Sequence, residues 1–131
     1  MSQLNVETIN LPGQQHHAET VFPLAFCSDQ PVNKAVIAEW VTEHRDQIED
    51  QLALTGAILF RGFGLKDDRD FDDFIRAFDW PNFTYAESLS NAVRRNRTEL
   101  VFTANEAPPT VSIFLHHEMA QTPVYPSKLF F

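Results

Sequence analysis

The triplet His116-His117-Glu118 contains the residues best suited to chemistry in this chain. Two histidines and a carboxylate that leave coordination positions open are the ligand set of a mononuclear non-haem iron site. The triplet ends an apolar run, and Glu118 lies 13 residues before the last residue, Phe131. The sequence therefore predicts that His116 and Glu118 are two ligands of a metal ion.

Spacing alone does not single out this pair. A His followed two residues later by an acid occurs three times, as His17 with Glu19, His44 with Asp46, and His116 with Glu118. The second pair falls in an expected helix, where side chains two residues apart point about 200° apart and cannot share one ion. The first pair lies in a segment with no predicted strand to orient it. Only the third pair follows a regular alternating run.

A strand from Val111 to Glu118 is the element expected to position the ligands. Side chains alternate across a strand, so His116 and Glu118 would share one face with Ser112 and Phe114. Such a face, changing from small polar and aromatic residues to ligands, is typical of a pocket wall, which makes Ser112 and Phe114 candidate substrate contacts. The alternative is a strand end that simply emerges into solvent.

Two amphipathic helices and a short strand are predicted upstream. Apolar residues recur at helical spacing from Asn33, a suitable N-cap, to Leu54, and Gly56 follows as a stop. Residues 57–60 are apolar throughout, which predicts a strand buried on both faces. A second helix is expected to start near Asp67 or Asp68 and to end at Trp80-Pro81.

The remaining segments predict little regular structure. Residues 1–30 are interpreted as an irregular arm with one edge strand, and residues 31–131 as one domain. Residues 81–110 are expected to form a long loop with a short strand at Leu100-Val101-Phe102. Long loops in compact domains are often functional, so Tyr85 in this loop is a further candidate substrate contact, although a tyrosine packed under the loop is the alternative.

Composition limits the class of protein. A length of 131 residues fits a single domain. Only one cysteine, Cys27, is present, which excludes an internal disulfide framework and favours a reducing cytoplasm. No leader-like segment and no apolar run of about 20 residues occurs, so no membrane association is expected. The formal charge of −8, from 10 basic and 18 acidic residues, argues against a nucleic-acid partner.

Several motifs in consistent order resemble the N-terminal part of the TauD/TfdA dioxygenases, and among them the branch related to the syringomycin-biosynthesis protein. The resemblance covers about Thr55 to Phe131, with a looser match in the helix before it. The motifs are Gly56-Ala57-Ile58-Leu59-Phe60-Arg61-Gly62-Phe63, Phe71-Asp72-Asp73-Phe74, Phe102-Thr103-Ala104-Asn105-Glu106-Ala107-Pro108-Pro109, Leu115-His116-His117-Glu118-Met119-Ala120 and Tyr125-Pro126-Ser127-Lys128-Leu129-Phe130-Phe131.

The resemblance implies an α+β protein with a double-stranded β-helix core, the jelly roll of clavaminate synthase-like enzymes, flanked by helices. It also implies Fe(II) as cofactor, 2-oxoglutarate and O₂ as cosubstrates, and hydroxylation of an amino acid or similar small molecule. In that family the His-x-Asp/Glu motif supplies two iron ligands, which correspond to His116 and Glu118.

The chain departs from the family pattern after Glu118. Members place a second metal-binding His downstream, followed by an Arg that pairs with 2-oxoglutarate, whereas residues 119–131 contain neither His nor Arg. The sequence is therefore interpreted as a truncated front part of a longer enzyme, with cofactor-binding residues expected beyond residue 131. The alternative is a catalytically inactive fragment that binds a partner or associates with itself through its open apolar end.

Overall fold

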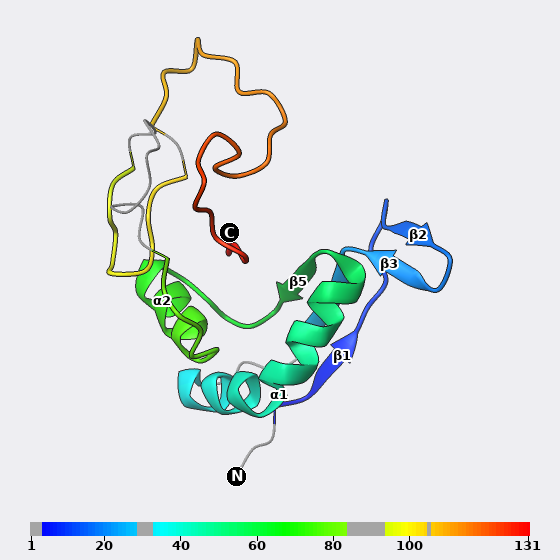
Figure 1. Ribbon diagram of the computed structural model, residues 1–131. Helices are drawn as coiled ribbons and strands as arrows, with labels where there is room; N and C mark the ends of the chain where they lie inside the picture. Colours follow the sequence, from blue (N-terminus) through cyan, green and yellow to red (C-terminus); the bar gives the residue numbers. More distant parts are fainter. Residues whose placement is uncertain (1–3, 29–32, 84–93, 105) are drawn as a thin grey trace. The chain divides into compact units, whose positions relative to one another are not determined.

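The computed structural model describes residues 4–28, 33–83, 94–104 and 106–131 (Figure 1). The chain divides into two compact units, Met1–Asp79 and Trp80–Phe131. The first contains every helix and strand found in the described residues, in the order β1 Val6–Thr8, β2 Gln15–His17, β3 Thr20–Phe22, β4 Leu24–Ser28, α1 Lys34–Thr55, β5 Ile58–Arg61 and α2 Asp68–Arg76. The expected mixture of α and β structure is confirmed. Neither helix is both long enough and apolar enough to cross a membrane, as judged over the described residues.

The two helices form where the local sequence predicts them. The Asn33 side chain accepts a hydrogen bond from the Val36 N–H at 3.0 Å, and Gly56 ends α1 in the left-handed conformation, with its N–H donating to Leu52. Asp67 caps α2 by accepting from the N–H groups of Arg69 and Asp70. The second helix ends at Arg76, before the Trp80-Pro81 boundary that the sequence predicted, because a turn already begins at Ala77.

The first 28 residues are more regular than the predicted arm. They contain four short strands rather than one, and β2 and β3 form an antiparallel hairpin of their own. Strand β4 lies at the centre of a three-stranded sheet, antiparallel to β1 and parallel to β5, with Leu24 opposite Ile58. The sequence signal was weak because each strand has only three to five residues.

Strand β5 is at the edge of that sheet, with α1 as the connection from β4. Ile58, Leu59 and Phe60 are therefore half-buried, and the prediction of a strand buried on both faces is wrong. Among the residues that the structure describes, β5 pairs with β4 alone.

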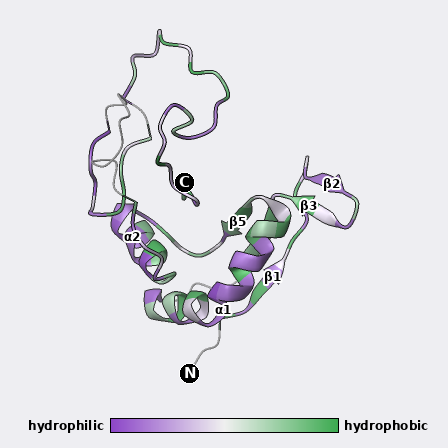
Figure 2. Cartoon of the chain, viewed as in Figure 1, coloured by the Kyte–Doolittle hydropathy of each residue, from purple (hydrophilic) through white to green (hydrophobic). Residues whose placement is uncertain are grey.

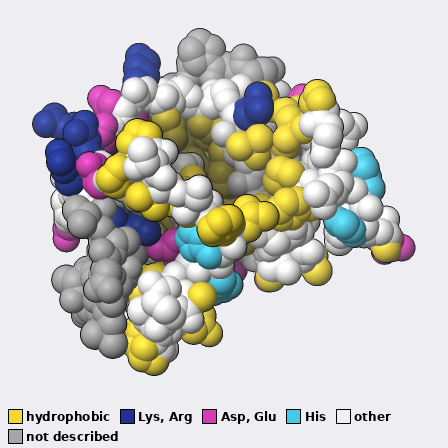
Figure 3. Space-filling view, turned by 90° about the horizontal axis from the view of Figure 1, so that it is seen from above, with side chains coloured by type: hydrophobic (Ala, Val, Ile, Leu, Met, Phe, Trp, Pro, Cys, Tyr) yellow, Lys and Arg dark blue, Asp and Glu magenta, His cyan; other side chains and the backbone are white. Residues whose placement is uncertain are grey.

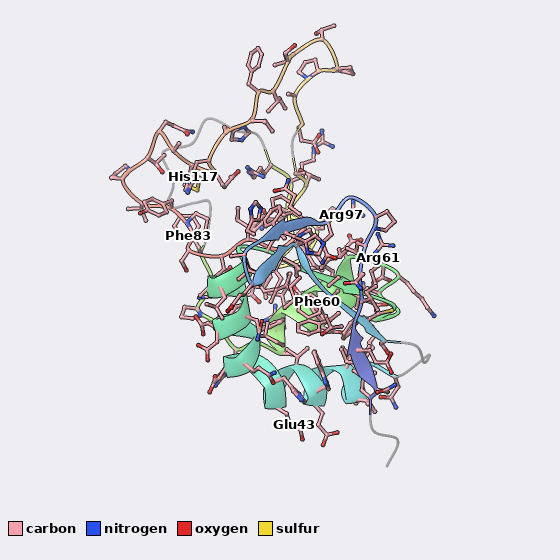
Figure 4. All side chains as sticks on the ribbon, turned by 90° about the vertical axis from the view of Figure 1, so that its right-hand side faces the viewer. Glu43, Phe60, Arg61, Phe83, Arg97 and His117 are labelled. Carbon is pink, nitrogen blue, oxygen red and sulfur yellow. The ribbon has the colours of Figure 1, made fainter. Side chains whose placement is uncertain are left out.

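Aromatic rings fill the space between the helices and this sheet. Phe60 is their centre, with its ring centroid 5.2 Å from that of Phe74, 5.4 Å from that of Phe63 and 5.8 Å from that of Phe26. Figure 4 shows Phe60 within this cluster and Glu43 projecting from the opposite side of α1. The alternation of polar and apolar residues along α1 and α2 in Figure 2 has the same cause, since one face of each helix packs inward.

The second unit lacks the strand expected from Val111 to Glu118. Residues 111–117 form no strand, and all of their side chains are exposed. A period-two pattern yields a strand only where a neighbouring strand accepts its backbone hydrogen bonds, and among the described residues none pairs with this segment. The prediction of a strand scaffold for the ligands is therefore wrong for this chain.

The strand predicted at Leu100-Val101-Phe102 is reduced to a single antiparallel bridge between Asn96 and Phe102. Around it the chain turns back on itself. The Thr103 N–H donates to Arg95 O at 2.9 Å and the Arg97 N–H donates to Val101 O at 2.7 Å. This hairpin-like turn, residues 95–103, is the most regular feature described in the second unit.

Candidate metal centre

His116 has one ring nitrogen engaged by its own backbone. Its Nδ1 lies 2.7 Å from the carbonyl oxygen of Phe114. Because a carbonyl oxygen can only accept, Nδ1 must carry the proton, and a neutral imidazole then has its lone pair on Nε2. Metal-binding histidines are commonly oriented in this way, by donating the other ring N–H to a carbonyl or carboxylate. His116 therefore has the tautomer that a metal ligand needs.

Glu118 is held by an arginine from a distant part of the sequence. Arg94 Nη2 donates to Glu118 Oε1 at 2.7 Å, and the exposed fractions of the two side chains are 17% and 18%. The other arm of the guanidinium, Nη1, donates to Ala104 O at 2.6 Å. Arg94 thus joins the carboxylate to the chain segment at Ala104.

The hairpin-like turn 95–103 explains why Arg94 can reach Ala104. Arg95 and Thr103 are bound to each other twice, since the Arg95 N–H donates to Thr103 Oγ1 and the Thr103 N–H donates to Arg95 O, each at 2.9 Å. Arg94 and Ala104 continue the two arms of this turn by one residue. Local backbone pairing therefore fixes the base from which the arginine side chain extends.

A tight turn follows Glu118. Met119 has a φ of +56° and is buried, and the Ala120 N–H donates to His117 O at 3.1 Å. Thr122 stabilises the turn, because its hydroxyl donates to Met119 O at 3.0 Å. A positive φ at a residue other than glycine is uncommon, and such conformations concentrate at functional sites.

His117 resembles His116 in its hydrogen bonding but has a different neighbour. Its Nδ1 lies 3.0 Å from Glu118 O, and its ring meets the Tyr125 ring edge-on at a centroid distance of 5.8 Å. Figure 4 labels His117 in the second unit, and Figure 3 shows histidine side chains at the molecular surface. The structure provides the same tautomer at both histidines, so the choice of His116 as ligand still depends on the sequence motif.

The candidate substrate contacts that the structure describes, Ser112 and Phe114, lie at the surface. Ser112 is exposed, and the Phe114 side chain is 83% exposed. Tyr85 lies outside the described residues. Their proposed roles stay predictions.

The described parts of the chain contain no group of three or more His, Cys, Asp or Glu side chains arranged to hold a metal ion. The pair of ligand types at His116 and Glu118 nevertheless fits Fe(II), because imidazole nitrogen and carboxylate oxygen both suit this ion. Arg94 is the residue of the site that the sequence did not reveal. It lies 24 positions before Glu118, and no periodicity or spacing connects them.

The described residues form a mixed α and β protein that carries a His-x-Glu motif, with two side chains of the types that bind non-haem iron. The sequence model of the taurine catabolism dioxygenase TauD, TfdA family matches residues 20–131, so the chain belongs to the TauD/TfdA family. This confirms the resemblance found in the sequence.

Two curated relatives are similar over much of the chain. A clavaminate synthase-like protein of Arabidopsis thaliana is 32% identical over 137 residues, which cover 100% of this chain and 41% of the relative. The dapdiamide synthesis protein DdaC of Enterobacter agglomerans is 32% identical over 97 residues, or 74% of this chain and 28% of that protein. The chain therefore spans less than half the length of either relative.

Proposed function

We propose that this chain forms the N-terminal, iron-binding part of a non-haem Fe(II)- and 2-oxoglutarate-dependent dioxygenase. The match of the TauD/TfdA family over residues 20–131, which includes the His-x-Glu motif, carries this proposal. Members of the family generally use Fe(II) and 2-oxoglutarate. His116 would bind the ion through Nε2 and Glu118 through a carboxylate oxygen.

The bound iron would supply oxidative decarboxylation of 2-oxoglutarate with O₂, coupled to hydroxylation of a substrate. The chain's own residues orient the ligands: Phe114 O holds the His116 ring, and Arg94 holds Glu118. A third iron ligand and the cation that pairs with 2-oxoglutarate are proposed to come from residues outside this chain, since residues 119–131 contain neither His nor Arg. The complete protein would form the jelly-roll core that the family implies.

The proposed substrate is an amino acid or a similar small molecule. This rests on the branch of the family that the motifs resemble, and the relative named for dapdiamide synthesis is compatible with it. Ser112, Phe114 and Tyr85 are the proposed contacts. The half-buried free thiol of Cys27 is compatible with the cytoplasmic location proposed for the protein.

Metal binding by the purified chain tests the proposal directly. Mn(II), a paramagnetic substitute for Fe(II), should broaden the His116 ring signals in NMR spectra at lower concentration than those of other histidines. His116→Ala and Glu118→Gln should each weaken binding by about tenfold or more, because each removes one of two ligands. His117→Ala is the matched control, since His117 is adjacent, exposed and similarly hydrogen-bonded. Equal loss in all three variants, or no binding by the wild-type chain, would contradict the proposed pair.

The second candidate function is a catalytically inactive module that binds a partner or associates with itself. The exposed apolar side chains of residues 111–115 favour it. Both readings predict no 2-oxoglutarate-dependent succinate release by the 131-residue chain with Fe(II) and ascorbate, but only the first predicts metal binding at His116 and Glu118. Robust turnover that His116→Ala abolishes would show that the chain needs no further ligand.

A further inference from the structure

We propose that Arg94 is a positioning residue for the candidate iron ligand Glu118, acting through a hydrogen bond to its carboxylate. This inference rests on the proposed function, because it takes Glu118 as a ligand. A carboxylate has two oxygens, and coordination through one of them leaves the other for a hydrogen bond. Arg94 Nη2 donates to Oε1 at 2.7 Å, which fixes the direction of the carboxylate.

Burial of the arginine distinguishes this ion pair from the other arginine ion pairs found among the described residues. The exposed fractions of the Arg94 and Glu118 side chains are 17% and 18%, whereas Arg95, the next residue, is 75% exposed and lies 3.5 Å from Glu106. Exposed ion pairs restrain their partners weakly, because water competes for both charges. A pair that is largely shielded from water holds its geometry better and leaves an uncompensated charge when one partner is removed.

The second hydrogen bond of Arg94 gives the restraint a fixed base. Nη1 donates to Ala104 O at 2.6 Å, next to the backbone pairing of Arg95 with Thr103. The guanidinium is planar, so binding Ala104 O with one nitrogen sets the direction of the other. Lysine has no such planar fork and could not hold both acceptors in one orientation.

The ligand motif lacks a strand in this structure, which makes the restraint more important. Residues 111–117 have no ladder of backbone hydrogen bonds among the described residues, so backbone pairing does not orient Glu118. The Phe114 carbonyl holds the His116 ring, and the Arg94 guanidinium holds the Glu118 carboxylate. Residues that orient metal ligands typically change metal affinity 10- to 100-fold when they are replaced.

The same Mn(II) titration tests the inference on the 131-residue chain. Arg94→Gln should weaken Mn(II) binding about 10- to 100-fold, and Arg94→Lys should fall between Arg94→Gln and the wild-type chain. Arg95→Gln is the matched control and should bind as the wild type does, because its partner is Glu106 rather than a ligand. Circular dichroism and the thermal midpoint identify any variant that fails to fold. If Arg94→Gln fails to fold, the Mn(II) affinity of Arg94→Lys tests the positioning role in its place.

The outcomes separate the two proposals. If the wild-type chain binds Mn(II) through His116 and Glu118 but Arg94→Gln binds equally well, the positioning role is wrong and the proposed metal pair stands. Tighter binding by Arg94→Gln would also overturn the positioning role, because it would mean that the arginine competes with the cation for the carboxylate. If the wild-type chain does not bind Mn(II), the metal pair fails and the inference fails with it.

Discussion

Of the glycines in the first unit, Gly62 is the one at which an added Cβ would lie closest to another atom. Its φ is +74°, and a Cβ at this position would lie 2.1 Å from the backbone oxygen of Ser28. Ser28 is the last residue of β4, which is the central strand of its sheet. Backbone held in a sheet cannot move aside as a flexible side chain can. The residue after β5 must therefore be glycine for both conformational and steric reasons.

We expect Gly62→Ala to lower the free energy of unfolding by about 2–5 kcal/mol, the combined cost of a left-handed alanine and of overpacking. Gly64→Ala is the matched control, because its φ is +67° and a Cβ there would have no atom within 4 Å. It should cost only about 1–2 kcal/mol, from the conformation alone. Urea denaturation followed by circular dichroism measures both. Equal losses in the two variants would argue against the close approach to Ser28.

At the scale of elements, an ion pair joins the start of α1 to the first turn of α2. Lys34 forms a salt bridge with Asp70, whose side chain is 9% exposed, and the Lys66 N–H donates to the same carboxylate at 3.0 Å. The hydrogen bond from Lys34, together with that from the Lys66 backbone, lowers the pKa of Asp70. The hydrogen bond with Asp70 in turn raises the pKa of Lys34.

This pair predicts a pH dependence of stability at acid pH. Because the folded state holds the Asp70 pKa below its ordinary value of 3.8, the unfolded chain takes up the proton first as the pH falls. The stabilisation is therefore full above the ordinary aspartate pKa and is lost as the pH falls through the lowered one. The Lys34 contribution is full below 10.5 and is lost at higher pH, as the lysine deprotonates.

Replacing Asp70 by Asn should destabilise the chain near neutral pH, and the difference from wild type should shrink as the pH falls below 3.8. Urea denaturation at several pH values measures this. Asp46→Asn is the control, because the Asp46 side chain is 91% exposed and its variant should match wild type at every pH. A constant difference between Asp70→Asn and wild type over the whole range would contradict the charge-based explanation.

The helices were predictable from sequence because their signals are local. The helices are capped by residues whose type alone suggests this role, namely Asn33, Gly56 and Asp67. The apolar spacing of α1 also matches its buried residues, which are Ile37, Val41 and Ile48. Strands need partners that are often distant in sequence, as Leu24 and Ile58 are. The four short strands before residue 29 were underestimated for this reason, and the strand expected at Val111–Glu118 was overestimated.

At the scale of the whole molecule, the two units differ in how much apolar surface they bury. Nine of the ten buried hydrophobic residues found in the described parts lie in Met1–Asp79, and only Met119 belongs to Trp80–Phe131. Large apolar side chains of the second unit are exposed instead, and hydrophobic side chains are visible at the surface in Figure 3. They are Val111, Ile113, Phe114, Leu115, Val124, Tyr125, Leu129 and Phe131. Exposed apolar patches of this kind favour association.

We expect the purified chain to associate with itself in a concentration-dependent manner, as measured by light scattering during gel filtration. Phe114→Ser should reduce this association, because the Phe114 side chain is 83% exposed within the apolar run. Leu54→Ser is the matched control, since Leu54 is 66% exposed but belongs to α1 of the first unit and not to that run. A strictly monomeric wild-type chain, or equal effects of the two substitutions, would contradict this expectation.

The sequence by itself determined the two helices, the choice of His116 and Glu118 as candidate ligands, and the family to which the chain belongs. These depend on residue type and short spacing, which the chain carries locally. The tertiary structure decided the pairing of β4 with β5, the ring cluster around Phe60 and the hold of Arg94 on Glu118. Each of these includes contacts between residues that are more than ten positions apart, and such contacts form only when packing brings the segments together.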